Sequence, residues 1–142
     1  MFEKVLLSID TSEDSEKAVR LTKELARVHG SQVLVVHGRD VLVSPSGRPA
    51  PPRVERRETN EEAQQLVDEA VTELQGAGVH ASGKVLSGQG RVGQRILEAA
   101  EENRADLIVL GSRAMSRLEE AIIGSASNKI VHTAKCPVLL VR

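Results

Sequence analysis

Aromatic side chains are almost absent from this chain of 142 residues, which has no Trp, no Tyr and a single Phe, Phe2. A core built from such a sequence must be aliphatic. Stacking of bases on aromatic rings, which single-stranded nucleic acid binders use, is excluded. The formal net charge is only −1, so no broad basic surface favours nucleic acid. We therefore expect no nucleic acid partner.

Cysteine and long apolar runs are also scarce. Cys136 is the only cysteine, which excludes an intrachain disulfide and a cysteine-based zinc cage. No apolar run approaches the roughly 20 residues that span a bilayer. The first ten residues, MFEKVLLSID, carry acids within a short apolar stretch and so make a poor signal peptide. We expect no membrane association and a location in the reducing cytoplasm.

Proline is concentrated in one stretch. Four of the five prolines lie in residues 38–58, together with five arginines. This composition predicts a long flexible loop within a single domain that spans residues 1–142, since the length suits one core. Two interpretations of the arginines remain open: a basic flap that closes over phosphates, or a solvated loop.

Outside that loop, apolar periodicity alternates between strands and helices. Strands are predicted at residues 2–9, 32–37, 79–86, 105–112 and 138–142, and helices at about 12–30, 59–76, 90–103 and from 125 onward. Ser12 is the expected N-cap of the first helix, and Gly30 its end. The side chains expected to face inward include Ala18, Leu21, Leu25 and Val28 in the first helix, and Ile130, Val131 and Ala134 in the last.

Alternation of strands and helices predicts an α/β fold, an open five-stranded parallel sheet with helices on both faces, as in Rossmann-like proteins. The first and fourth strands are the most apolar, so they are expected at the centre of the sheet. Open parallel sheets bind ligands beyond the carboxyl ends of their strands. If these two strands are neighbours, Asp10 and Gly111 face one crevice.

The spacing Gly88-x-Gly90-x-x-Gly93 matches that of a dinucleotide-binding turn. Such a fingerprint normally occupies the first strand-to-helix turn and requires an acid at the end of the next strand. Here it lies on the third such turn, and the next strand ends at Gly111. We interpret these glycines as a turn before a helix, with Gly93 allowing close packing of the helix on the sheet.

Residues 111–127 form the most informative segment. Gly111 lies where a buried strand turns outward, and Gly124 and Ser125 lie just before the last helix. Two such turns can present backbone N–H groups to one anion, and a helix N-terminus adds a positive dipole end. Ser125 and Ser127 can donate to phosphate or cap the helix, and both interpretations stay open at this point.

The stretches ADLIVLGSRAMSRLEEAIIGSASNKIVHTAKCPVLLVR and KVLLSIDTSEDSEKAVRLTKELA resemble the universal stress protein family. Nucleotide-binding members of that family carry G-x-x-G, nine residues, and then G-[ST]. This sequence has Gly111-Ser112-Arg113-Ala114, nine residues, and then Gly124-Ser125. The spacing is retained, and Ala114 replaces the second glycine.

The resemblance implies the sheet order 3-2-1-4-5, as in adenine nucleotide alpha hydrolase-like proteins, and a homodimer joined through the last strand, Val138–Arg142. It also implies a site for ATP with Mg²⁺, or for ADP or AMP. Asp10 would bond the adenosine end, and the backbone of Gly38 and Arg39 would lie near the adenine. The residues expected at the phosphates are Gly111, Arg113, Ala114, Gly124, Ser125 and Ser127.

Three functions remain in competition at this point. The first is a nucleotide-binding protein of stress response or signalling. The second is a nucleotide-free dimeric interaction module, because the methyl group of Ala114 can obstruct contact between phosphate and backbone. The third is a small-molecule transferase or hydrolase of related architecture. No general base is evident beside the phosphates, so we predict no catalytic residue and, at most, very slow ATP hydrolysis.

Overall fold

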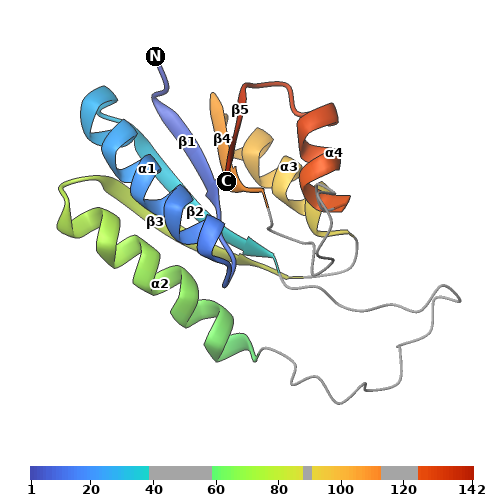
Figure 1. Ribbon diagram of the computed structural model, residues 1–142, viewed down its shortest axis with the longest axis horizontal. Helices are drawn as coiled ribbons and strands as arrows, with labels where there is room; N and C mark the ends of the chain where they lie inside the picture. Colours follow the sequence, from blue (N-terminus) through green and yellow to red (C-terminus); the bar gives the residue numbers. More distant parts are fainter. Residues whose placement is uncertain (39–58, 88–90, 113–124) are drawn as a thin grey trace, which may run out of the picture.

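The computed structural model describes residues 1–38, 59–87, 91–112 and 125–142 (Figure 1). Within them, strands and helices alternate along the chain as predicted. In chain order they are β1 (Lys4–Ser8), α1 (Glu13–His29), β2 (Gln32–Gly38), α2 (Asn60–Gly76), β3 (His80–Leu86), α3 (Val92–Glu102), β4 (Leu107–Gly111), α4 (Ser125–Thr133) and β5 (Val138–Val141). The predicted loop at 38–58 lies, beyond Gly38, outside the described residues.

The five strands form one parallel sheet in the order β3-β2-β1-β4-β5. The predicted order and the central position of the first and fourth strands are confirmed. In the β1–β4 ladder Val5 lies opposite Leu107 and Ser8 opposite Leu110. The carboxyl ends of these two strands are therefore level with each other at one edge of the sheet.

Helices cover both faces of the sheet, with α1 and α2 on one side and α3 and α4 on the other (Figure 1). Successive side chains of a strand point to opposite faces, so each central strand contributes to two cores. In β1, Val5 and Leu7 pack beneath α1, whereas Leu6 joins the core of the opposite face with Ile108 of β4. Burying such a side chain fully contributes roughly 1.5–3 kcal/mol, which fixes the centre of the sheet firmly.

The ends of α1 follow the sequence signals. Ser12 adopts an extended conformation and its side chain accepts a hydrogen bond from the Ser15 N–H at 3.2 Å. Gly30, with φ of 67°, ends the helix, and its N–H reaches the Ala26 carbonyl. A left-handed residue at this place favours glycine. Both predictions for α1 are confirmed.

The predicted inward face of two helices is partly wrong. Leu21 is 41% exposed and Val28 is 80% exposed. The face of α1 that is buried instead carries small and polar residues, Asp14, Ser15, Ala18, Val19, Thr22 and Ala26. Small residues let the helix lie close to the sheet, and this leaves the large apolar side chains on its flank. In α4, Val131 is likewise 43% exposed, while Ile130 is fully buried.

Gly93 does permit close packing, but against a helix rather than the sheet. A Cβ atom at Gly93 would lie 3.1 Å from the Cα and 3.2 Å from the carbonyl oxygen of Ala126 in α4. The first turns of α3 and α4 therefore touch. The expected contact between a helix and the sheet through a glycine occurs at Gly38, where a Cβ would collide with the side chain of Val92. Gly88 and Gly90 lie outside the described residues.

No helix in the described parts of the chain combines the length and the apolar character needed to cross a membrane.

Candidate functional site

The carboxyl ends of β1 and β2 are joined by two hydrogen bonds. The Ile9 N–H donates to the Val36 carbonyl at 2.9 Å. The buried ring of His37 donates from Nδ1 to the Ile9 carbonyl at 2.8 Å. Because a carbonyl can only accept, this contact fixes the proton on Nδ1. The backbone that leads into Asp10 is thus held rigidly against the end of β2, where Gly38 lies.

Asp10 organises the turn between β1 and α1. Its Oδ1 accepts the Ser12 N–H at 2.7 Å, and its own N–H is bonded to Ser15 Oγ at 2.8 Å. The side chain is half-buried. A carboxylate has two oxygens and about four acceptor positions, so this turn uses only part of the capacity of Asp10. The orientation of the carboxylate is set before any ligand arrives.

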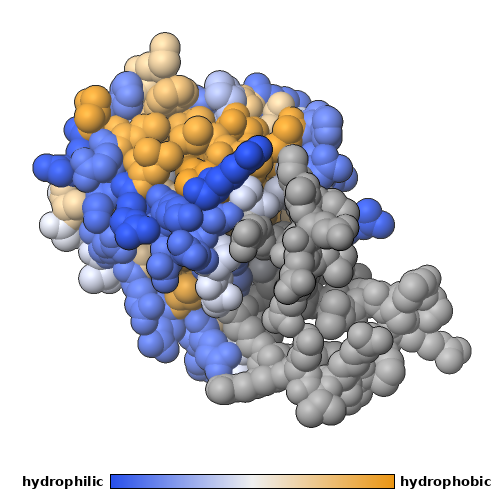
Figure 2. Space-filling model, viewed as in Figure 1, coloured by the Kyte–Doolittle hydropathy of each residue, from blue (hydrophilic) through white to orange (hydrophobic). Residues whose placement is uncertain are grey.

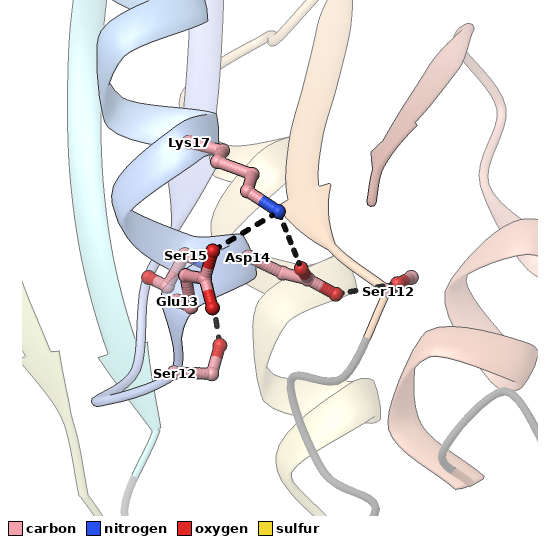
Figure 3. A network of polar contacts seen from close by, with 6 residues as sticks. All are labelled: Ser12, Glu13, Asp14, Ser15, Lys17 and Ser112. Carbon is pink, nitrogen blue, oxygen red and sulfur yellow. Dashed lines mark hydrogen bonds and ion pairs between the residues drawn. The ribbon is translucent and has the colours of Figure 1, made fainter. Parts of the chain in front are cut away.

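The end of β4 is packed tightly against the first turn of α1. A Cβ atom at Gly111 would lie 2.9 Å from the Asp14 carbonyl carbon and 3.0 Å from the Ser15 nitrogen. One residue later, Ser112 Oγ donates to Asp14 Oδ2 at 2.7 Å, and the two side chains point toward each other in Figure 3. The Ser112 N–H donates to the Val141 carbonyl at 2.7 Å, so this amide is already engaged by β5.

The four helices present their N-termini at this same edge, because each follows a parallel strand. The first turns of α1 and α2 carry acids that offset the positive pole of the helix dipole. The first turns of α3 and α4 carry none. Arg91 at the N-cap of α3 makes no side-chain capping bond. Two of the four positive poles therefore have no acid in their first helical turn.

Charge and polar groups gather around these two poles. Arg95 of α3 is buried, and its Nη1 donates to the Leu86 carbonyl at the end of β3 at 2.7 Å. In the first turn of α4, Ser127 is fully buried, and its Oγ has no hydrogen-bond partner among the described residues. A buried hydroxyl without a partner is unfavourable by about 1–3 kcal/mol.

The structure brings part of the predicted site together. Asp10, Gly38 and Gly111 lie at the ends of the three adjacent strands β1, β2 and β4, and Ser127 lies in the first turn of α4. The remaining predicted residues, Arg39, Arg113, Ala114 and Gly124, together with the side chain of Ser125, lie outside the described part of the molecule. The arrangement can bind an anion at the N-termini of α3 and α4, and the carboxylate of Asp10 can accept hydrogen bonds from a ligand.

Two residues of this site were not identified from the sequence. They are Asp14, in the first turn of α1, and His37, near the end of β2. Each acts through a partner distant in sequence, Ser112 and Ile9 respectively. The available signal was the glycine at 111, since a missing Cβ at the end of a central strand indicates close approach of another element.

Other features of the described residues offer weaker sites. No group of three or more His, Cys, Asp or Glu side chains in these ranges is arranged to hold a metal ion. A cavity of about 400 Å³ lies at the opposite edge of the sheet, at the amino ends of β2 and β3. Its lining includes Gln75, His80, Ser82 and Asn103, and none of the described lining residues is Lys or Arg. Nothing there matches a phosphate.

Comparison with known proteins places these features in a family context. The family model described as "Universal stress protein family" matches residues 1–142. A universal stress protein from Thermus aquaticus is 37% identical over 142 residues, covering all of both chains. The universal stress protein YxiE of Bacillus subtilis is 33% identical over 150 residues and likewise covers both chains entirely.

Solved structures agree on the fold. The universal stress protein from Archaeoglobus fulgidus in complex with dAMP has a TM-score of 0.71 at 23% identity and covers 100% of this chain and 98% of its own. A universal stress protein in complex with cAMP has a TM-score of 0.73 at 20% identity, with 99% and 97% coverage. At these identities the likeness establishes the fold.

The unpartnered hydroxyl of Ser127 gives a stability test. In the free protein, Ser127→Ala should leave the free energy of unfolding unchanged or raise it by up to about 1 kcal/mol, since no protein hydrogen bond is lost. Thr22 in the middle of α1 also has a buried Oγ without a partner among the described residues, so Thr22→Val is a matched control with the same expectation. Urea unfolding measures both. A loss above about 1 kcal/mol for Ser127→Ala alone would contradict the assignment.

Proposed function

The chain belongs to the universal stress protein family, and from that membership we propose that it binds an adenine nucleotide at the carboxyl edge of its sheet. The role that we propose for it is stress response or signalling in the cytoplasm through the bound nucleotide, with at most very slow ATP hydrolysis. Two family-like structures carry dAMP and cAMP, which supports an adenine nucleotide as the ligand class.

The observation that carries the proposal is the pair of adjoining helices, α3 and α4, whose first turns contain no acid. Gly93 and Ala126 keep the first turns of α3 and α4 in contact, so two positive dipole ends lie together. Helix N-termini bind phosphate through free N–H groups and the dipole. Ser127 Oγ, buried and unpartnered among the described residues, supplies a hydroxyl donor at the same place. We assign the phosphate end of the ligand to this pair.

The nucleoside end is assigned to β1 and β2. Asp10 is pre-oriented by the Ser12 N–H and retains acceptor capacity for ribose or base donors. The end of β2 is bonded to the Ile9 backbone through Val36 and His37, and we assign the main-chain groups of the next residue, Gly38, to the base edge. The rest of the proposed site is assigned from the sequence alone and consists of Arg39, Arg113, Ala114, Gly124 and Ser125.

A divalent cation belongs to the proposal only when the ligand is a triphosphate. Mg²⁺ usually keeps several waters and is bound by phosphates plus one or two carboxylates. Asp10 is assigned to the nucleoside end, so the proposal takes no carboxylate ligand for the cation from the described residues. The phosphates, rather than a protein cage, would supply most of the coordination.

The second candidate function is a nucleotide-free interaction module. It is favoured by one specific feature, Ala114, at the second glycine position of the motif. If that position requires positive φ, alanine costs on the order of 1 kcal/mol, and a cost of about 1.4 kcal/mol is already tenfold in affinity. The retained spacing between Gly111 and Gly124 favours nucleotide binding over the nucleotide-free module.

We also propose that the chain forms a homodimer through β5. Val138–Val141 are all half-buried, and this strand ends the sheet with β4 as its neighbour. The carbonyl of Pro137 accepts from Ile108 of β4, and that of Val141 accepts from Ser112, which directly follows β4. By alternation the N–H and C=O groups of Val138 and Leu140 therefore point to the open edge. An apolar open edge invites another strand.

The surface beside β5 supports the same proposal. Leu21, Leu25 and Val28 lie on the flank of α1 that also carries Asp14, whose carboxylate meets β4. The opposite flank carries Lys23, which pairs with Glu73 of α2 at 2.8 Å. The apolar flank therefore faces β5. Figure 2 shows apolar side chains gathered on this face of the molecule, in the region where Figure 1 places α1, β4 and β5.

Calorimetry with Mg-ATP and with AMP tests the nucleotide proposal. Binding is expected to the native chain and to Thr22→Val. Ser127→Ala is expected to weaken AMP roughly tenfold, since a hydrogen bond to a charged group contributes about 1.5–3 kcal/mol. If neither nucleotide gives heat at about 1 mM, the proposal is rejected. A dissociation constant above about 1 mM corresponds to a binding free energy weaker than about 4 kcal/mol.

Ala114→Gly separates the two candidate functions in the same experiment. A change of threefold or less in nucleotide affinity means that the alanine is tolerated and the native chain is a nucleotide-binding protein. The other outcome is that the native chain shows no detectable binding and Ala114→Gly binds the nucleotide at least a hundredfold more tightly, a gain of about 2.7 kcal/mol. That result would favour the nucleotide-free module instead.

For the dimer, light scattering is expected to give twice the monomer mass for the native chain. Leu140→Pro should give a monomer, because proline removes an N–H that points to the open edge and leaves the bonds between β4 and β5 in place. An unchanged melting temperature at low concentration confirms that the variant is folded. A monomeric native chain at about 100 μM would contradict the proposal, since a stable dimer associates well below that concentration.

A further inference from the structure

The peptide unit that joins Ile9 and Asp10 is held at both of its polar groups by side chains from two different elements. On one side its carbonyl accepts a hydrogen bond from Nδ1 of His37 in β2 at 2.8 Å. On the other side its N–H donates to Oγ of Ser15 in α1 at 2.8 Å. His37 is 7% exposed and Ser15 is 2% exposed. Both bonds are therefore shielded from water, which strengthens them.

The two bonds act on one rigid body, because a peptide unit is planar and resists rotation about its C–N bond. A rotation of this plane about the line between its two Cα atoms would disturb both bonds at once. The preceding peptide is fixed as well, since the Ile9 N–H donates to the Val36 carbonyl at 2.9 Å. The path of the backbone into the Cα atom of Asp10 is thus set by three hydrogen bonds, and two of them come from side chains.

The same turn also orients the carboxylate of Asp10. Its Oδ1 accepts from the Ser12 N–H at 2.7 Å, and Ser12 Oγ accepts from the Ser15 N–H at 3.2 Å. Ser15 therefore supports the turn twice, through its backbone at the helix cap and through its hydroxyl at the Asp10 peptide. A binding group that is held in place before the ligand arrives avoids the loss of free energy that ordering it would bring.

We propose that His37 and Ser15 are positioning residues for the nucleoside end of the ligand. They hold the peptide before Asp10 so that the Asp10 carboxylate meets the nucleoside in one orientation, and neither side chain needs to touch the ligand. This inference rests on the proposed nucleotide site, in which Asp10 binds the nucleoside, and it adds two residues on which the affinity of that site depends.

Calorimetry with adenosine and with AMP measures the contribution of the two side chains. His37→Leu and Ser15→Ala each remove one bond to the peptide and should weaken both ligands about fivefold, which corresponds to roughly 1 kcal/mol. His37→Asn should restore the affinity to within about twofold, because its amide nitrogen takes the place of Nδ1. His37→Gln places its amide nitrogen near the position of Nε2 and should not restore it. Thr22→Val is the control, whose affinity should equal that of the native chain.

A double-mutant cycle with Asp10→Ala shows whether the histidine acts through Asp10. Asp10→Ala alone should weaken adenosine about tenfold or more, as expected for the loss of a hydrogen bond to a charged group. In that background His37→Leu should weaken adenosine by less than a further factor of about two, because no carboxylate remains to be oriented. Combined with Ser127→Ala at the assigned phosphate end, His37→Leu should instead be additive for AMP within about twofold.

The native chain offers a test that needs no variant. At a pH where the His37 ring is neutral, its nitrogen NMR spectrum should show the proton on Nδ1, and the Asp10 amide should exchange slowly with solvent in the free protein. Melting temperatures identify the variants that are folded. If His37→Leu does not fold, Ser15→Ala takes its place in the affinity comparison and in both double-mutant cycles.

Three outcomes overturn the inference. One is an affinity for adenosine within about twofold of the native value in the folded His37→Leu and Ser15→Ala chains. Another is additivity of His37→Leu with Asp10→Ala, which would mean that the histidine acts on the ligand by a route other than Asp10. The third is a neutral His37 ring that carries its proton on Nε2. Failure of the proposed function looks different, because then the native chain itself binds neither adenosine nor AMP, and the inference falls with it.

Discussion

The pairing of β1 with β4 in the middle of the sheet is the constraint on which the rest of the structure depends. The ladder from Val5 to Ser8 opposite Leu107 to Leu110 is buried on both faces. It brings the chain just after residue 8 next to the chain just after residue 111, although about a hundred positions separate them in sequence. Asp14 meets Gly111 and Ser112 only because these two strands are neighbours.

Electrostatics divides the carboxyl edge of the sheet into two parts. On the side of α1 the first helical turn is acidic, and its buried member, Asp14, is bound to Ser112. On the side of α3 and α4 the first turns have no acid, and the buried guanidinium of Arg95 lies nearby at the end of β3. By its helix dipoles the second part favours an anion, and the first part does not.

Sequence periodicity predicted the fold well because its signals are local. Alternation of apolar strands and helices, the N-cap at Ser12 and the glycine at position 30 all act within a few residues, and the structure confirms them. The inward face of α1 is predicted only in part, since Ala18 is buried as expected but Leu21 and Val28 are exposed, and small residues such as Ala26 form the contact with the sheet. Size complementarity between packed elements decides such faces, and periodicity does not record it.

The site was predictable only in outline. Strand-end positions such as Asp10 and Gly111 follow from the fold class, because parallel sheets bind ligands at that edge. The bond between Asp14 and Ser112, the contact of Gly93 with Ala126 and the bond from His37 to Ile9 depend on tertiary neighbours. No spacing along the chain encodes these three contacts, and they are the ones that shape the ligand end of the molecule.

The most direct test of the account is a titration of the ¹⁵N-labelled chain with AMP, followed through the backbone amide resonances. The account predicts that the shifts concentrate on the carboxyl edge, at Asp10, Gly38 and Gly111 and in the first turns of α3 and α4. Resonances of the cavity at the opposite edge, such as those of Gln75 and Ser82, should not move. Shifts confined to that cavity, or no shifts at all at saturating AMP, would contradict the account.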